Sequence, residues 1–166
     1  DSYNTHDLYY YARVISLRNF FYHSDNGFQQ LRNAGGLRMI KDLQVIRKIQ
    51  SYQNKVIRLD EMQKLMEQIL SGYRDRAAVL FSGKVFKRMF VDPGSKDIYK
   101  RFQKPEGDPE LMTADRAVIN EFLVKAIYVN SNSTSLLINL TDLLNEAEGL
   151  HQLLAAAYHL GEQKGP

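Results

Sequence analysis

Apolar residues recur along two stretches of the chain with the spacing of an α-helix. In the first stretch they step by fours and threes with one polar member, and these positions are Val45, Ile49, Tyr52, Val56, Leu59, Gln63, Met66, Leu70, Tyr73, Ala77 and Leu80. This is the spacing of a heptad seam, along which one helix packs against another. No proline interrupts the stretch. We therefore predict a long helix over about 42–82, with Asp42 as its N-cap.

The same rhythm returns near the C-terminus. Its seam consists of Phe122, Ala126, Val129, Ser133, Leu136, Leu140, Leu143, Ala147, Leu150, Leu154 and Ala157. This predicts a second long helix over about 113–160, with Thr113 as its N-cap and Gly161 as its stop. Six weak helix formers occupy positions 130–135. We expect the helix to continue through them, and the alternative is a break followed by a restart at a Ser or Thr cap.

The remaining segments predict shorter helices and loops. The spacing of aromatic and aliphatic residues over 7–22 predicts a first helix. Phe28 and Leu31 predict a second, short helix that ends at the glycine pair 35–36. The segment 83–112 contains an Asp-Pro-Gly-Ser run and two further prolines, so we predict a loop-rich pole there with one short helix.

Together these elements predict an all-α fold. Two long helices with seams of matching length and a long connection favour an antiparallel bundle, with the shorter N-terminal helices packed against the pair. The chain has 166 residues, of which 44% are hydrophobic and 25% charged. That size and composition are typical of one globular domain, so we predict a single helical bundle domain over 1–166.

No pattern in the sequence indicates catalysis or metal binding. The chain has no cysteine, its four histidines form no zinc-binding pattern, and no serine lies in a nucleophile elbow. Asp142 and Glu146 are four residues apart, and we expect this pair to face solvent. We therefore predict a protein that is not an enzyme, with no catalytic residues, no metal and no cofactor.

Two groups of residues are candidates for binding. The net charge is +3, but the segment 83–104 holds seven basic residues against two acidic ones, and these candidate ligands for an anionic partner are Lys84, Lys87, Arg88, Lys96, Lys100, Arg101 and Lys104. Aromatic residues interleave with them, a pattern that suits a phosphate or lipid surface and equally suits a solvated bundle pole. A candidate pocket between helices is formed by Tyr10, Tyr11, Phe21 and Tyr52, although such residues more often belong to a core.

The segment Phe28-Gln29-Gln30-Leu31-Arg32-Asn33-Ala34-Gly35-Gly36-Leu37-Arg38-Met39-Ile40 resembles the G-G-L-R-x-I segment of an uncharacterised family of bacterial membrane-anchored proteins. The ending from Leu153 to Leu160 is similar to the last helix of that family. The resemblance implies one membrane span, before a helical domain outside the cytoplasm, and no catalytic residues. It also implies that an N-terminal anchor precedes Asp1, which fits the lack of a methionine before Met39.

Two functions follow as expectations. The first is a non-catalytic sensor or interaction domain in the periplasm or another extracytoplasmic space, tethered to the membrane, with an unknown small ligand or protein partner. The second is a cytoplasmic helical protein that binds a partner or nucleic acid through the basic segment 84–104. Nucleic acid is disfavoured because the overall basic balance is small and no binding motif occurs. A second copy of the chain is a further partner left open.

Overall fold

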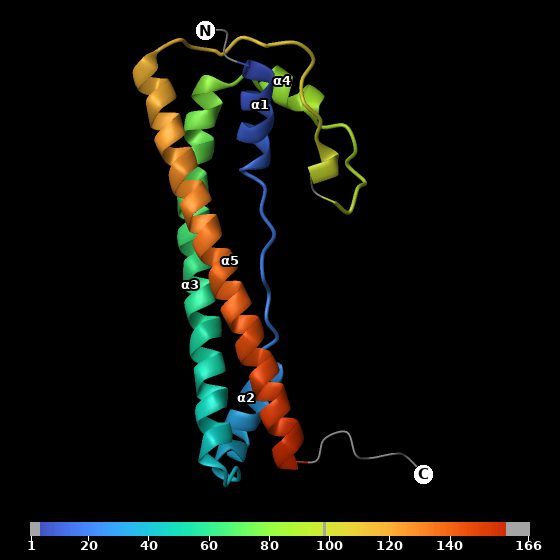
Figure 1. Cartoon of the computed structure of the whole chain (residues 1–166), viewed down its shortest axis with the longest axis vertical. Helices are drawn as coiled ribbons and strands as arrows, with labels where there is room; N and C mark the ends of the chain where they lie inside the picture. The colour runs from blue at the N-terminus through green and yellow to red at the C-terminus, as the bar shows by residue number, and fades with distance from the viewer. Residues whose placement is uncertain (1–3, 98, 159–166) are drawn as a thin grey trace. The chain divides into compact units, whose positions relative to one another are not determined.

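The computed structural model describes residues 4–97 and 99–158, and these residues are almost entirely helical or in loops. The elements in chain order are α1 (Thr5–Val14), α2 (Asn26–Asn33), the 3-10 helix η1 (Gly36–Arg38), α3 (Leu43–Leu80), α4 (Gly83–Met89), the 3-10 helix η2 (Tyr99–Arg101) and α5 (Arg116–Tyr158) (Figure 1). The one β-type pairing within the described ranges is an isolated antiparallel bridge between Phe90 and Phe102. The predicted all-α class is confirmed.

The chain forms two compact units. Unit 1 consists of Asp1–Asn19 with Lys64–Thr134, and unit 2 consists of Phe20–Gln63 with Ser135–Pro166. Each of the long helices α3 and α5 is divided between the two units, and the parts of the two helices pack together within each unit. The single domain expected from chain length stays a prediction.

Unit 1 has an aromatic core. The ring of Tyr73 on α3 lies 5.1 Å from that of Phe122 on α5, centroid to centroid. Tyr9 on α1 has no exposed surface, and its ring lies 4.8 Å from Phe81. The Tyr73 hydroxyl donates a hydrogen bond of 2.8 Å to the carbonyl of Ala12, which fastens α1 to α3. In Figure 1, α1 lies beside α4 within this unit.

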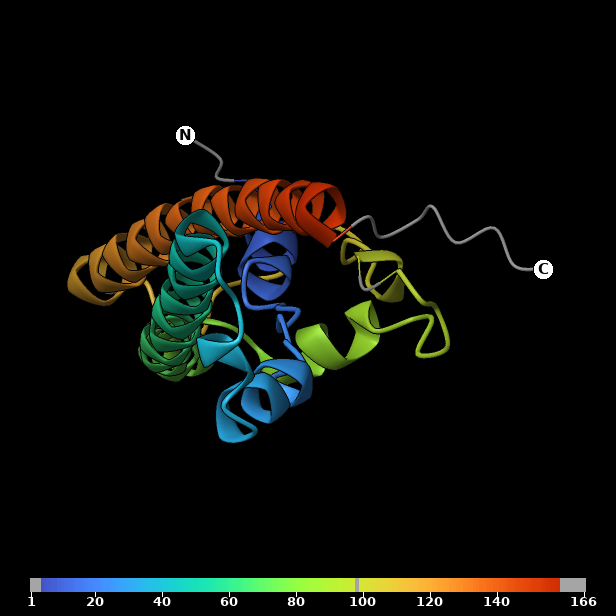
Figure 2. The ribbon, with the colours of Figure 1, turned by 90° about the horizontal axis from the view of Figure 1, so that it is seen from below.

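Unit 2 has a smaller aliphatic core. Val56 and Leu59 of α3 pack with Leu143 of α5, and Phe21 and Tyr52 pack against these three. Figures 1 and 2 both show the first part of α3 beside the last part of α5 in this unit.

The short helix α2 ends where the glycine pair predicts. Gly35 has a φ of 68°, a left-handed conformation that glycine adopts without the steric cost of a Cβ. A Cβ on Gly36 would lie 2.7 Å from Cδ1 of Leu31 and 3.0 Å from the Leu31 carbonyl oxygen, so a larger residue there would force this turn to shift. Both glycines therefore have a local structural role in unit 2.

The seam predicted for α3 is confirmed. Ten of its eleven positions are buried, including the polar Gln63, and Tyr52 is half-buried. The seam of α5 is only partly confirmed, because Phe122, Val129 and Leu143 are buried whereas Ser133 and Ala157 are exposed.

α5 exposes apolar residues beside its seam in both units. In unit 1 the exposed residues are Leu123, Val124, Ile127 and Tyr128, and in unit 2 they are Leu137, Ile138, Leu144 and Tyr158. The helix also continues through positions 130–135 as expected, and polar side chains there bond back to carbonyls one turn earlier, such as Asn132 to Tyr128 at 2.8 Å.

The first helix is shorter than predicted. α1 ends at Val14, whereas the sequence pattern predicts a helix over 7–22. In unit 2 the backbone of Phe21 is not helical and is held by a side chain of α3: its N–H donates to Oε1 of Gln63 at 2.8 Å, and its carbonyl accepts from Nε2 at 3.1 Å. The one polar member of the α3 seam thus replaces helical hydrogen bonds at Phe21.

An aspartate caps the start of each of the two long helices. Asp42 accepts a 2.7 Å hydrogen bond from the Gln44 amide, which confirms it as the cap of α3. The prediction of Thr113 as the cap of α5 is wrong by two residues, because the helix begins at Arg116 and Asp115 accepts the Ala117 amide at 2.7 Å. The predicted stop at Gly161 lies outside the described residues. None of the helices in the described ranges combines the length and the apolar character that crossing a membrane requires.

Candidate functional site

The basic residues selected from the sequence all lie in unit 1. Lys104 forms an ion pair with Asp7 of α1, and the pKa of the Asp7 carboxyl falls below its ordinary value chiefly because Lys104 donates a hydrogen bond to it. Nε of Arg101 donates to the carbonyl of Ser95 at 2.8 Å. Lys104 therefore fastens the loop after α4 to α1, and Arg101 fastens this loop to its own backbone. Four others are exposed and form no ion pair with any described residue: Lys84, Lys87, Arg88 and Lys96.

The four residues of the predicted aromatic pocket do not belong to one unit. Phe21 and Tyr52 pack on the core of unit 2. Tyr10 packs on the core of unit 1, and Tyr11 is 60% exposed there. None of the cavities described below is lined by any of the four.

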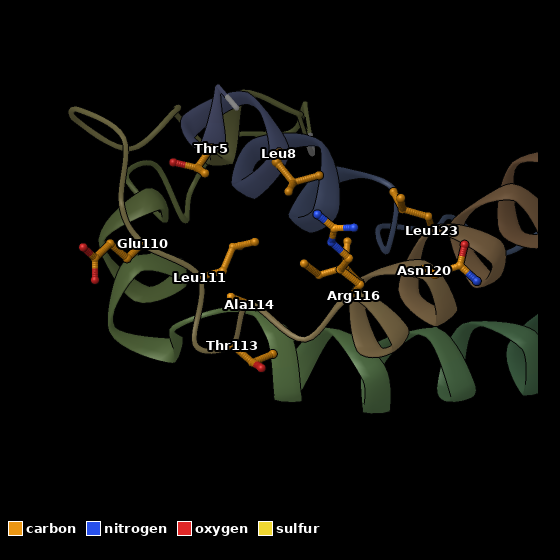
Figure 3. A pocket seen from close by; sticks show the side chains of 10 residues that line it. Thr5, Leu8, Glu110, Leu111, Thr113, Ala114, Arg116, Asn120 and Leu123 are labelled. Atoms are coloured by element: carbon orange, nitrogen blue, oxygen red, sulfur yellow. The ribbon is translucent and has the colours of Figure 1, made fainter. Parts of the chain in front are cut away.

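A cavity of about 900 Å³ lies in unit 1 between α1, the segment 110–114 and the beginning of α5 (Figure 3). We call it the α1–α5 cavity. Its lining residues are Thr5, Leu8, Glu110, Leu111, Thr113, Ala114, Arg116, Ile119, Asn120 and Leu123. Most of the lining surface is apolar, and a few polar groups are distributed around it.

The wall formed by the segment 110–114 is fixed by hydrogen bonds to distant parts of the chain. The Tyr9 hydroxyl donates to the carbonyl of Glu110 and accepts from the amide of Ser82, both at 2.9 Å. The amide of Met112 donates to the carbonyl of Leu80 at 3.0 Å. The loop wall of the cavity is therefore positioned by hydrogen bonds to the buried Tyr9 and to the last residue of α3.

A further contact ties the start of α1 to the chain just before this wall. The backbone amide of His6 donates to Oδ1 of Asp108 at 3.3 Å, and its Nδ1 lies 3.2 Å from the same oxygen. The pKa of the Asp108 carboxyl falls below its ordinary value, mainly because that backbone amide stabilises the charged form. Thr5, the neighbour of His6, is thereby held at the rim of the cavity.

Arg116 is the most distinctive polar group of the α1–α5 cavity. In Figure 3 its side chain extends toward Leu8, while the carboxylate of Glu110 points away from the middle of the cavity. Arg116 forms no ion pair with any described residue. Oγ1 of Thr5 is buried without a hydrogen-bond partner among the residues that the structure describes. Arg116 is exposed, and a ligand with an anionic group at its end of the cavity would pair with the guanidinium.

None of the lining residues is among the candidates selected from the sequence. One signal was nevertheless present: the segment 105–160 contains eight acidic residues and only two basic ones, Arg116 and Lys125. Lys125 pairs with Glu121 on the next turn at 3.7 Å. Arg116, unlike Lys125, forms no ion pair with a described acidic residue, although acidic residues predominate in this segment.

Glu146 in unit 2 is also placed differently from expectation. We expected it to face solvent with Asp142, but its side chain is only 10% exposed and pairs with Lys48 at 3.1 Å and Lys55 at 3.2 Å. Burial raises the pKa of the Glu146 carboxyl, but hydrogen bonds from Lys48, Ser51 and Lys55 together outweigh burial and lower it. This cluster joins α3 to α5 and has a structural role.

No group of three or more metal-ligating side chains occurs in the described ranges 4–97 and 99–158. The lining contains two hydroxyls, those of Thr5 and Thr113, and one carboxylate, that of Glu110. The chain matches no protein-family model, no curated protein and no solved structure.

Proposed function

We propose that the protein is a non-catalytic helical binding domain and that its ligand occupies the α1–α5 cavity. The observation that carries this proposal is the combination of a mostly apolar lining with one unpaired guanidinium and a few further polar groups. Ligand sites in proteins have this character: apolar walls supply affinity and a small number of polar groups fix orientation.

The lining also defines the class of ligand. Leu8, Leu111 and Ile119 offer aliphatic surface, which suits an apolar chain or ring. Arg116 offers a charged fork that pairs with a carboxylate or phosphate. The ligand is therefore a small amphipathic anion, with its acid group at Arg116 and its apolar part against α1.

The experiment uses decanoate as the probe, with 1-decanol as its uncharged counterpart, and saturation-transfer NMR as the readout. Ala114→Phe fills the cavity from its exposed rim, and Ala117→Phe places the same ring on α5 outside the lining. Decanoate should bind the unaltered protein and the Ala117→Phe variant, and should not bind the Ala114→Phe variant. Arg116→Gln should weaken decanoate about tenfold and leave decanol unchanged. Equal binding by the two alanine variants, or no binding by the unaltered chain, refutes the proposal.

The finer architecture is also part of the proposal: α3 and α5 form an antiparallel pair. In unit 2, Cε of Lys48 lies 3.4 Å from where a Cβ on Gly149 would be, whereas Lys55, about two turns further along α3, pairs with the earlier residue Glu146. In unit 1, Arg76 pairs with Glu121 at 2.6 Å. As the residue number rises along α3, the residue number of its partner on α5 falls, which supports opposite chain directions for the two helices.

The cellular setting of this domain follows from the resemblance of its G-G-L-R-x-I segment. We propose an extracytoplasmic domain of a bacterial protein that is tethered to the membrane by an N-terminal anchor, where ligand binding serves as a sensor input. Detection of the natural protein in the membrane fraction, with the domain accessible to protease from outside the cytoplasm, tests this setting. Recovery in the soluble cytoplasmic fraction would refute it.

A second candidate function is favoured by the basic residues of unit 1. Lys84, Lys87, Arg88 and Lys96 are exposed without ion pairs in the described ranges, and Lys87 lines a hollow together with the exposed ring of Phe90. This arrangement suits a cytoplasmic protein that binds an anionic partner. Affinity for a single-stranded oligonucleotide that falls steeply with salt would favour this alternative.

A further inference from the structure

A second group of hollows in unit 1 lies around Arg13, away from the α1–α5 cavity lining. Two adjoining hollows, of about 320 and 420 Å³, share Arg13, Gly83 and Phe86 in their linings. The first hollow continues between α1 and α3, where Ser16 and Arg74 line it. The second hollow continues along α4 to the two residues of the isolated β-bridge, and its further lining residues are Lys87, Phe90 and Phe102. We call the two hollows together the Arg13 groove.

Arg13 carries a half-buried charge with no acidic partner. Its guanidinium carbon lies 4.6 Å from the centroid of the Phe102 ring, and Nη1 donates to Oγ of Ser16 at 3.2 Å. No carboxylate of the described residues forms an ion pair with it. Burial lowers the pKa of the Arg13 guanidinium, and the like charge of Arg74 lowers it further. The charge of Arg13 is thus held against a ring but is not neutralised.

The surroundings of Arg13 add positive charge. Neither hollow has an aspartate or glutamate in its lining. Glu67, a carboxylate outside both linings, pairs with Arg74 at 2.7 Å and with Arg18 at 3.5 Å. Lys87 is exposed at the other end of the groove. A concave surface lined by one sign of charge concentrates ligands of the opposite sign.

Flat aromatic rings form the walls of the second hollow. Phe90 is 47% exposed, and its ring lies 5.3 Å from that of Phe102, centroid to centroid. Phe86 of α4 lines both hollows. An exposed phenylalanine beside an open hollow offers a stacking surface for a planar ring, which an aliphatic ligand would use less well.

We propose that the Arg13 groove is a binding site for a small aromatic acid, whose carboxylate or sulfonate pairs with Arg13 and Lys87 and whose ring stacks on Phe86 and Phe90. This site differs from the α1–α5 cavity in lining, and the ligand differs in having an aromatic body. The proposal stands independently of the function proposed above.

Gly83 allows a direct test of occupancy. Gly83 lines both hollows, and a Cβ built on it meets no other atom within 4 Å, so a side chain can be added at this edge of the groove without a clash at its first atom. Gly27 provides a matched control: it also lies in the first turn of a short helix, α2 in unit 2, and its Cβ position is equally open. Gly83→Leu should therefore block the groove, and Gly27→Leu should not.

The probe is 4-(trifluoromethyl)benzoate, observed by fluorine NMR, with 4-(trifluoromethyl)benzamide as the uncharged counterpart. We expect the benzoate to bind the unaltered protein and the Gly27→Leu variant, and to lose binding to Gly83→Leu. The benzamide should bind at least about tenfold more weakly than the benzoate, because a charge-assisted hydrogen bond is lost. Arg13→Gln should weaken the benzoate by a similar factor, and Lys64→Gln, an exposed change on α3 outside both linings, should have no effect.

Several outcomes would overturn the proposal. No benzoate binding at roughly 10 mM, equal affinity for acid and amide, or unchanged binding by Gly83→Leu would each do so. Loss of benzoate binding in Ala114→Phe but not in Gly83→Leu would assign the probe to the α1–α5 cavity instead. Arg13→Gln is checked for folding by its urea midpoint. If this variant unfolds, the pair of glycine variants still decides the question.

Discussion

Gln63 is the position where helix periodicity and tertiary structure make opposite predictions. A leucine at this place would complete the apolar seam of α3, so the heptad pattern alone predicts that Gln63→Leu stabilises the protein. In unit 2, however, the Gln63 amide satisfies both the N–H and the carbonyl of Phe21. Gln63 is 8% exposed, so water does not readily replace it.

The size of the effect can be worked out from these contacts. Each lost hydrogen bond costs about 1 kcal/mol, and a backbone group left buried without a partner adds about 1–3 kcal/mol. Burying the leucine side chain returns about 1–2 kcal/mol. The net expectation is a loss of about 2 kcal/mol in the free energy of unfolding, or a melting temperature lower by roughly 4–8 °C for a chain of this length.

The assay is urea denaturation of the variant beside Gln50→Leu, which makes the same chemical change at an exposed position of α3. The control should stay within about 0.5 kcal/mol of the unaltered chain. Hydrogen exchange gives a local readout, because the Phe21 amide should be protected in the unaltered protein and should exchange quickly in Gln63→Leu. A variant with a urea midpoint equal to or above that of the unaltered chain would refute the reasoning.

Three further predictions test the core and the buried charge. Leu59→Asp should cost about 4 kcal/mol or more, because Leu59 is 1% exposed, whereas Leu140→Asp should cost less because Leu140 is half-buried; equal urea midpoints would contradict this order. Tyr9→Phe should cost about 1–3 kcal/mol through its two lost hydrogen bonds and should expose the Ser82 amide to exchange; unchanged protection there would contradict the assigned bond. The pKa of Glu146 is lower in the folded protein than its ordinary value of 4.5, so the ionised carboxylate stabilises the fold at every pH above 4.5. This stabilisation is lost as the pH falls through the lowered pKa. The difference in urea midpoint between the unaltered chain and Glu146→Gln should therefore shrink between about pH 7 and about pH 3, and a constant difference would count against it.

The sequence alone was enough to predict the helical elements whose signals are local. The seam of α3, its Asp42 cap and the end of α2 at Gly35 all depend on residues within a few turns of one another. A helix has a fixed period, so the spacing of apolar residues reports directly on the face that is buried. The same reasoning predicted the continuity of α5 through positions 130–135.

Tertiary structure decided the features that join residues far apart in the chain. The α1–α5 cavity exists because Tyr9 bonds to Glu110, about a hundred positions away, and no local pattern indicates such a pair. α1 ends early although its spacing continues, and Gln63 then supplies partners to the backbone at Phe21. Arg13 and Glu146 look like ordinary surface charges in the sequence, and only packing shows that one is half-buried without an acid and the other is enclosed by lysines. Periodicity determines which face of a helix is apolar, but burial and hydrogen bonding depend on what the rest of the chain places against that face.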